Sequence, residues 1–253
     1  MSASILVAGF HRSGTSAVAR ALHTVGLHLG HELLGAESAN PYGHFEDLAV
    51  IAAHDDALGR TGQTWKSPDT CADPNDEILR GDIQNIVTDR ERSGRPWAIK
   101  DPRLCLFLQE WLDAAPAANV IVVFRRPGDA IASLHRRHVR RFVHTRGVDP
   151  TDRAFWERPD LGVKLWIRYH EQLLAQLPAP ERVLALNFSD RASIEQLPNT
   201  VSQRWGIPVT TTEPIRLDPR LGTPSPDAIE VRDTTLIERA RYVWGQLLAI
   251  TPN

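Results

Sequence analysis

Cysteine, methionine and tyrosine are scarce in this chain of 253 residues, which has two cysteines, one methionine and three tyrosines. Two cysteines, Cys71 and Cys105, are too few for a disulfide framework or for a metal site built from four thiolates. We therefore expect both to be buried thiols, predict no metal site, and expect the protein in the reducing cytoplasm.

Long hydrophobic runs and an excess of one charge are also missing. No stretch of about 18 apolar residues is present, so no membrane span is expected. The N-terminus has no basic region ahead of its first apolar run, which argues against a signal peptide. With 29 Lys and Arg against 31 Asp and Glu, the formal net charge is −2, which argues against nucleic acid as the partner.

The composition is that of an ordinary globular protein, with 42% hydrophobic and 24% charged residues, and we expect one domain over residues 1–253. Short apolar runs alternate with amphipathic stretches, and this pattern predicts an α/β fold with a central parallel sheet in a three-layer α/β/α arrangement. The expected strands are 5–8, 96–100, 119–124 and 182–188, and the expected helices are 14–26, 45–58, 75–92, 104–112, 127–144, 161–177, 189–205 and 233–250.

The first expected strand leads into a turn with glycine at both ends, Gly9 and Gly14, and then into a helix. Such a turn places backbone N–H groups and a helix N-terminus around an anion, and Arg12 adds a cation to it. The spacing matches the nucleoside-triphosphate loop G-x-x-x-x-G-K-[ST], except that Thr15 stands where that loop has its Lys. We therefore do not expect a terminal phosphate to be held there by a lysine.

A second anion site is predicted where the strand 119–124 ends. Arg125 follows this strand directly, and Ser133 lies eight residues further on in the next expected helix. The alternative is that Arg125 is a solvated arginine at the helix start and that Ser133 bonds back to its own helical turn.

The two motifs, Gly9-Phe-His-Arg12-Ser-Gly-Thr-Ser16 and Arg125-Arg-Pro-Gly-Asp-Ala-Ile-Ala-Ser133, together resemble the donor site of sulfotransferases that use 3′-phosphoadenosine 5′-phosphosulfate (PAPS). The resemblance implies the P-loop-like sulfotransferase architecture. It also implies that Arg125 and Ser133 hold the 3′-phosphate, while Arg216 and Arg220 in the late Pro-rich stretch are possible further cations for it. The residues that would hold the 5′-phosphosulfate are Arg12, Ser13, Gly14, Thr15 and Ser16.

The segment Lys100-Asp101-Pro102 resembles the Lys-Asp-Pro segment of tyrosylprotein sulfotransferases. This resemblance makes Lys100 the cation that stabilises the transition state, together with Arg12. Since two cations can stabilise the charge that develops during sulfuryl transfer, no metal is required. The alternative is that Lys100 is a strand-end charge paired with Asp101.

The general base stays ambiguous, because Pro102 stands where soluble sulfotransferases carry a catalytic His. The segment 40–47, which contains Asn-Pro-Tyr-Gly-His-Phe-Glu, resembles a segment of bacterial sulfotransferases that turns toward the acceptor pocket. We favour Glu46 as the base, then Glu32, then His44. The alternative for Glu46 is a charge that complements the dipole of the following helix.

The resemblance implies transfer of a sulfuryl group from PAPS to a hydroxyl of a small-molecule, sugar or lipid acceptor. Trp65 could line the acceptor site, and the basic run 135–146 could either steer anions or form a solvated helix face. Two alternatives stay open, namely a P-loop kinase that acts on a small molecule and a nucleotide-binding module without catalysis. The acceptor and the oligomeric state are left open by the sequence.

Overall fold

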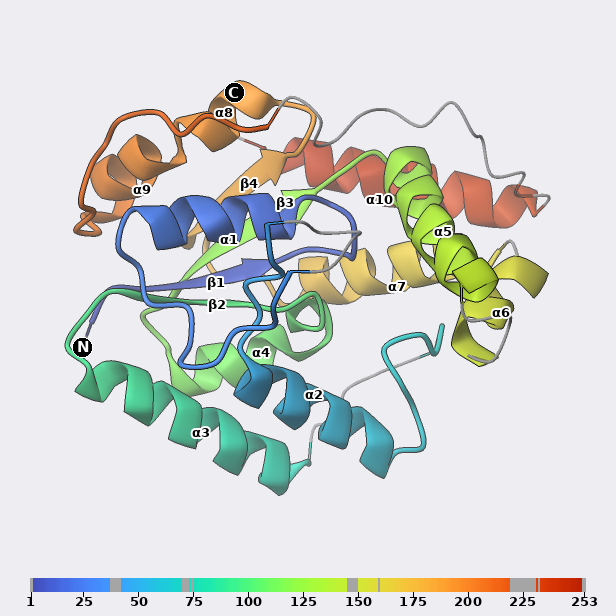
Figure 1. The fold of residues 1–253 in the computed structure, drawn as a ribbon, viewed down its shortest axis with the longest axis horizontal. Coiled ribbons are helices and arrows are strands. Elements are labelled where there is room, and N and C mark those ends of the chain that lie inside the picture. The colour runs from blue at the N-terminus through green and yellow to red at the C-terminus, as the bar shows by residue number, and fades with distance from the viewer. Residues whose placement is uncertain are drawn as a thin grey trace.

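The computed structural model describes residues 2–36, 42–69, 73, 75–144, 150–158, 160–218, 231 and 233–251. Within these ranges a sheet of four parallel strands lies between two layers of helices (Figure 1). The predicted α/β fold with a central parallel sheet is therefore confirmed. The single domain over residues 1–253 stays a prediction.

The strands are β1 (Ser4–Ala8), β2 (Trp97–Lys100), β3 (Asn119–Phe124) and β4 (Val183–Asn187), in the order β2-β1-β3-β4. In the register of the sheet, Val7 lies opposite Lys100 on one side of β1, and Ala8 lies opposite Val122 on the other. The carboxyl ends of β1, β2 and β3 therefore meet at one edge, where open α/β sheets bind their ligands.

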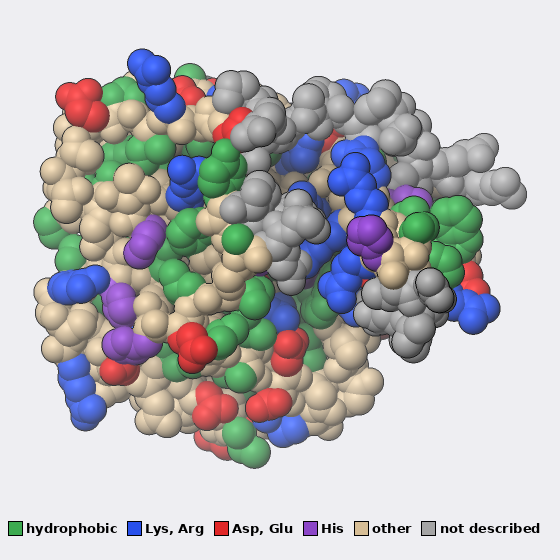
Figure 2. All heavy atoms as spheres, in the orientation of Figure 1, with side chains coloured by type: hydrophobic (Ala, Val, Ile, Leu, Met, Phe, Trp, Pro, Cys, Tyr) green, Lys and Arg blue, Asp and Glu red, His purple; other side chains and the backbone are tan. Residues whose placement is uncertain are grey.

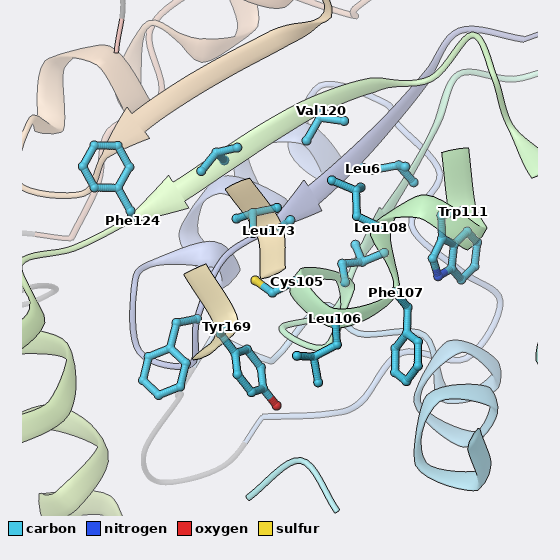
Figure 3. Packing of buried hydrophobic residues seen from close by; sticks show 14 of the residues in the cluster. Leu6, Cys105, Leu106, Phe107, Leu108, Trp111, Val120, Phe124, Tyr169 and Leu173 are labelled. Carbon is cyan, nitrogen blue, oxygen red and sulfur yellow. The ribbon is translucent and has the colours of Figure 1, made fainter. Parts of the chain in front are cut away.

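Alternate residues of β1 enter two separate hydrophobic clusters, because successive side chains of a strand point to opposite faces of the sheet. Ile5 and Val7 pack with α1 (Thr15–Thr24), α8 (Arg191–Glu195) and α9 (Leu197–Trp205). Leu6 and Ala8 belong to the cluster on the other face, part of which is shown in Figure 3. The helices that contribute to that second cluster include α2 (Leu48–Arg60), α3 (Glu77–Arg92), α4 (Leu104–Ala114), α7 (Leu161–Ala175) and α10 (Thr234–Ala249).

Two helices, α5 (Pro127–His144) and α6 (Pro150–Glu157), pack against each other and lie beside α7 at one side of the molecule (Figure 1). No helix was expected between the predicted helices 127–144 and 161–177, and α6 corrects that expectation. Pro150 and Asp152 lie in the first turn of α6, where proline and an acidic side chain both favour a helix start.

Three predicted helix starts are wrong by one to three residues, because aspartates one or two positions further along act as the caps. The helix expected from Phe45 begins at Leu48, since the side chain of Asp47 accepts a hydrogen bond from the Ala49 N–H. Asp76 caps α3, so the helix expected from residue 75 begins at Glu77. Asp190 caps α8, and the helix expected over 189–205 is two helices that meet at Gln196.

Cys105 is fully buried, as expected, and burial raises the pKa of its thiol. Cys71 lies outside the described residues.

Gly9 is required at the end of β1 because the neighbouring strand approaches it closely. A Cβ at this position would lie 2.1 Å from the carbonyl O of Val123. We expect Gly9→Ala to lower the free energy of unfolding by about 1–3 kcal/mol in urea denaturation, since β3 must shift to make room. Gly59→Ala is the matched control, because Gly59 of α2 is exposed and no atom lies within 4 Å of a Cβ built there. This variant should raise the free energy of unfolding, since alanine favours a helix more than glycine does. Equal stabilities of the two variants would contradict this prediction.

Candidate active site

The two predicted anion sites lie next to each other. The loop after β1 and the start of α5 follow neighbouring strands, and the Arg12 Nε donates a hydrogen bond to the Ser133 Oγ over 3.1 Å. This hydrogen bond joins two residues that are 121 apart in the chain, one in the loop after β1 and the other in α5. Figure 2 shows Lys and Arg side chains gathered beside α5 on the same face of the molecule.

The loop after β1 has the strained backbone and the buried polar atom of a ligand cradle. Arg12 has a φ of 67° and Gly14, the N-cap of α1, has a φ of 95°. Among the described residues, Arg12 and Phe45 are the non-glycine residues with positive φ; Arg12 is itself a predicted catalytic residue, and Phe45 lies between two others, His44 and Glu46. The Ser13 side chain is completely buried, and its hydroxyl has no hydrogen-bond partner. A buried hydroxyl without a partner indicates a ligand oxygen at this place.

Four arginines influence one another around this loop. The pKa of Arg12 is lowered to about 10, first by burial and then by Arg137, Arg125 and Arg136. The pKa of Arg125 is also lowered by burial and by Arg136, although Asp129 acts in the opposite direction. Cations that lower each other's pKa form a concentrated positive field, and a polyanion bound among them would relieve their repulsion.

Lys100 joins the loop to the segment that contains the favoured base. Its Nζ donates hydrogen bonds to the Ser16 Oγ over 3.2 Å and to the His44 carbonyl over 3.0 Å, and it forms a buried ion pair with Glu46. His44 Nδ1 lies 3.9 Å from the same Glu46 oxygen. The structure therefore brings Lys100, Glu46 and His44 together beside the loop after β1.

The alternative partner of Lys100, Asp101, forms a different ion pair. Its carboxylate accepts hydrogen bonds from the backbone N–H and from the Nη1 of Arg103, each over 2.7 Å. Trp111 donates to the Nε2 of His54 over 2.9 Å, so the N–H proton of the His54 ring lies on Nδ1, which is 3.3 Å from Asp101. Arg103 and His54 hold the pKa of Asp101 far below its usual range. This buried network anchors the chain directly after Lys100, and sequence reasoning missed it.

A second ion pair holds the segment around Glu46. One carboxylate oxygen of Asp47 caps α2, and the other pairs with Arg90 of α3 in a buried contact. Because Asp47 directly follows Glu46, this pair restricts the position of the Glu46 backbone.

The remaining predicted site residues lie in different surroundings. Glu32 is exposed, and its described contact is a backbone one, in which its carbonyl accepts a hydrogen bond from the Leu48 N–H over 2.9 Å. The Thr15 side chain is buried at the start of α1. Arg216 is exposed, and Arg220 lies outside the described residues. The catalytic and binding roles of all these residues stay predictions.

His11, which the sequence analysis did not identify, lies between Phe10 and Arg12 in the loop after β1. Its ring centroid is 4.2 Å from that of Trp65, and its Nε2 is buried without a hydrogen-bond partner. Burial, and after it the charge of Arg103, lowers the pKa of His11 well below its usual value, so the ring is neutral near pH 7. A neutral imidazole nitrogen next to an indole suits a hydroxyl-bearing ligand.

Buried histidines also make the stability depend on pH. His170 is fully buried and donates from Nδ1 to the Trp166 carbonyl, and burial lowers its pKa from 6.5 to about 4. The unfolded chain therefore binds one proton more than the folded chain between these two values. We expect the free energy of unfolding to fall as the pH drops from 6.5 to about 4, by up to about 3 kcal/mol from this group.

Urea denaturation across this pH range tests the effect of His170. The variant His170→Leu should show a flatter pH dependence of stability, while His23→Leu, at an exposed position of α1, should keep the slope of the parent chain. Identical slopes for the parent chain and His170→Leu would contradict the assignment.

Among the described residues, no group of three or more His, Cys, Asp or Glu side chains is arranged to hold a metal ion. No described helix combines the length and the apolar character that crossing a membrane requires.

The chain belongs to the sulfotransferase family, because the family model described as "Sulfotransferase domain" matches residues 4–176. This range includes both anion motifs, Lys100 and Glu46. The predicted resemblance is thereby confirmed at the level of the family. Comparison of the sequence with curated proteins gave no match.

A solved sulfotransferase domain shares the fold at low sequence identity. The sulfotransferase domain from the curacin biosynthetic pathway is 15% identical with a TM-score of 0.50, over 100% of this chain and 99% of that chain. A sulfotransferase from Alicyclobacillus acidocaldarius is 15% identical with a TM-score of 0.49, over 99% and 94% of the two chains. Sulfotransferase STF9 from Mycobacterium avium is 12% identical with a TM-score of 0.49, over 98% and 76%.

Proposed function

We propose that this chain transfers the sulfuryl group of PAPS to a hydroxyl group of a small-molecule, sugar or lipid acceptor. The observation that carries the proposal is the contact between Arg12 and Ser133, which joins the two anion sites at one edge of the sheet. A molecule with charged groups at its 5′ and 3′ positions could contact both sites at once. This arrangement supports a PAPS site, since PAPS carries charged groups at both of these positions.

The residues at the edge of the sheet fit this donor. The Ser13 hydroxyl, buried and without a partner, would bind an oxygen of the 5′-phosphosulfate together with the N-terminus of α1. Arg125 and Ser133 would hold the 3′-phosphate, and Arg136 and Arg137 would add to the positive field around it. When bound, PAPS supplies the sulfuryl group and a phosphate leaving group.

The chemistry of this chain's residues follows from their placement. In the transfer, a bond forms between the acceptor oxygen and sulfur while the bond from sulfur to the 5′-phosphate oxygen breaks. Lys100 Nζ, which contacts Ser16 of the loop, would stabilise the charge that develops on the transferred group and on the leaving oxygen. Glu46, beside Lys100, would accept the proton of the acceptor hydroxyl, with His44 as the neighbouring alternative.

We place the acceptor on the side of the loop where His11 and Trp65 lie, since Glu46 and Lys100 are also reached from that loop. His11 shows electrostatic interactions with Lys100 and Asp101, which indicates that its ring lies near the proposed reacting groups. The low cysteine content supports the cytoplasm as the place of action.

Mass spectrometry of metabolites tests the proposal directly. Purified protein is incubated with PAPS and an extract of host metabolites in the presence of a metal chelator, and products that gain one sulfate are sought. We expect sulfated product and 3′-phosphoadenosine 5′-phosphate in equal amounts, and neither with Arg12→Ala. Phosphorylated product from ATP and Mg2+ would instead support a kinase, and donor binding without any product would support a binding module.

A further inference from the structure

We propose that the tip formed by the end of α5 and by α6 binds the surface of an anionic lipid membrane. This inference concerns a surface apart from the proposed donor site, and it stands or falls separately from the proposed function. The inference starts from large apolar side chains that are exposed to solvent close to one another.

The tip carries large apolar side chains in water. Val143, near the end of α5, is 68% exposed, and Trp156 in α6 is 58% exposed. The ring of Phe142 stacks on that of Trp156, with centroids 6.4 Å apart and planes at 5°. Figure 2 shows hydrophobic side chains gathered over this end of α5 and over α6, at the right edge of the face. Trp156 thus remains more than half exposed although its ring contacts that of Phe142.

The same tip is basic. Residues 138–158 contain five arginines and three acidic residues, whereas the whole chain has a net charge of −2. Arg140, Arg141, Arg153 and Arg158 are exposed here, and Arg141 and Arg153 also contact the carboxylates of Asp152 and Glu157. Exposed positive charge around the apolar side chains is complementary to an anionic surface.

Contacts between buried side chains hold α5 and α6 in a fixed arrangement. His138 of α5 hydrogen-bonds Asp152 of α6 over 2.6 Å, and both side chains are buried. His138 also stacks on Phe155 at 4.3 Å. The exposed Trp156 therefore belongs to a helix that is anchored on its other side.

A membrane fits this surface better than a protein partner does. A stable protein interface needs roughly 800 Å² from each partner around a packed apolar centre, which a few protruding side chains do not provide. The interface of a bilayer needs no shape complementarity. It accommodates tryptophan and phenylalanine at the headgroup level and attracts arginine through its anionic lipids.

The donor site lies on the other part of the same helix. Arg136 and Arg137 interact electrostatically with Arg12, whereas Arg140, Arg141 and Val143 lie one to two turns further along α5. If the proposed sulfuryl transfer holds, a membrane bound at the tip would favour a hydroxyl-bearing amphiphile as the acceptor.

Co-sedimentation with lipid vesicles tests the inference on the full chain. The vesicles contain either phosphatidylcholine alone or phosphatidylcholine with phosphatidylglycerol, and excess 3′-phosphoadenosine 5′-phosphate is present to occupy the donor site. We expect binding to the anionic vesicles that weakens with added salt. Trp156→Ser should weaken it about tenfold, and Arg140→Gln about fivefold.

Matched controls come from α10, where Tyr242 is 67% exposed and Arg241 is also exposed. Tyr242→Ser and Arg241→Gln should bind vesicles as the parent chain does. The inference is overturned by absent binding to anionic vesicles, or by equal losses in the tip variants and the α10 variants. It is also overturned if Trp156→Ser abolishes self-association in solution while vesicle binding is unchanged, because the tip would then contact a second copy of the chain.

Discussion

Lys100→Met should lower the turnover number for sulfuryl transfer by about 10²–10³-fold while leaving the affinity for the donor nearly unchanged. The Lys100 ammonium is buried against Ser16 and Glu46, so it is held in place before the reaction and loses little solvation during it. A fixed cation of this kind stabilises mainly the charge that develops in the transition state. Single-turnover kinetics with saturating PAPS measure the effect.

Lys100→Met leaves the buried Glu46 carboxylate without its cation, which can lower the stability of the protein. Partial unfolding would also lower the measured turnover. Thermal denaturation and the double variant Lys100→Met, Glu46→Gln, which removes both charges, control for this. A folded Lys100→Met protein that retains the turnover of the parent chain would contradict the assignment of Lys100.

Glu46→Gln should lower turnover by about 10²–10⁴-fold, because a glutamine side chain cannot accept the proton of the acceptor hydroxyl. The expected loss is in the turnover number, with little change in the Michaelis constant for the donor. Initial rates over a range of acceptor and donor concentrations measure it.

The two other candidate bases are the controls for this prediction. Glu32→Gln should keep full activity, because Glu32 is exposed and has no described side-chain contact with Lys100 or Glu46. His44→Asn should have an intermediate effect, since the Nδ1 of His44 lies 3.9 Å from Glu46. If Glu46→Gln is fully active and Glu32→Gln is inactive, the general base is Glu32 and the assignment of Glu46 is wrong.

The parallel sheet could be predicted from the sequence because each strand is a short, continuous apolar run. The strand expected over 119–124 coincides with β3, and the others agree with β1, β2 and β4 to within two residues at either end. Helix starts were less certain, because aspartates at neighbouring positions compete as caps and tertiary packing selects among them. The short helix α6 was missed because proline and charged residues at 149–159 are typical of a loop as well as of a helix start.

The motifs of the site could be recognised from the sequence, but their contacts could not. Spacing along the chain placed Arg12 and Arg125 after strands, while the hydrogen bond from Arg12 to Ser133 depends on β1 and β3 being neighbours. The choice of Glu46 over Asp101 as the partner of Lys100 depends on Arg103, at the N-cap of α4, and on His54 of α2, which both contact Asp101. No local pattern predicts such contacts, since their members lie on separate elements.

Binding calorimetry with 3′-phosphoadenosine 5′-phosphate and with ADP tests the claim that one donor spans both anion sites. The two ligands share adenosine and charge at the 5′ position, and only the first has a 3′-phosphate. We predict that Arg125→Ala weakens binding of the first ligand about 10–100-fold and leaves ADP binding unchanged, because a charged hydrogen bond to the 3′-phosphate is lost. Absent binding of 3′-phosphoadenosine 5′-phosphate, or equal weakening of both ligands by Arg125→Ala, would contradict the account.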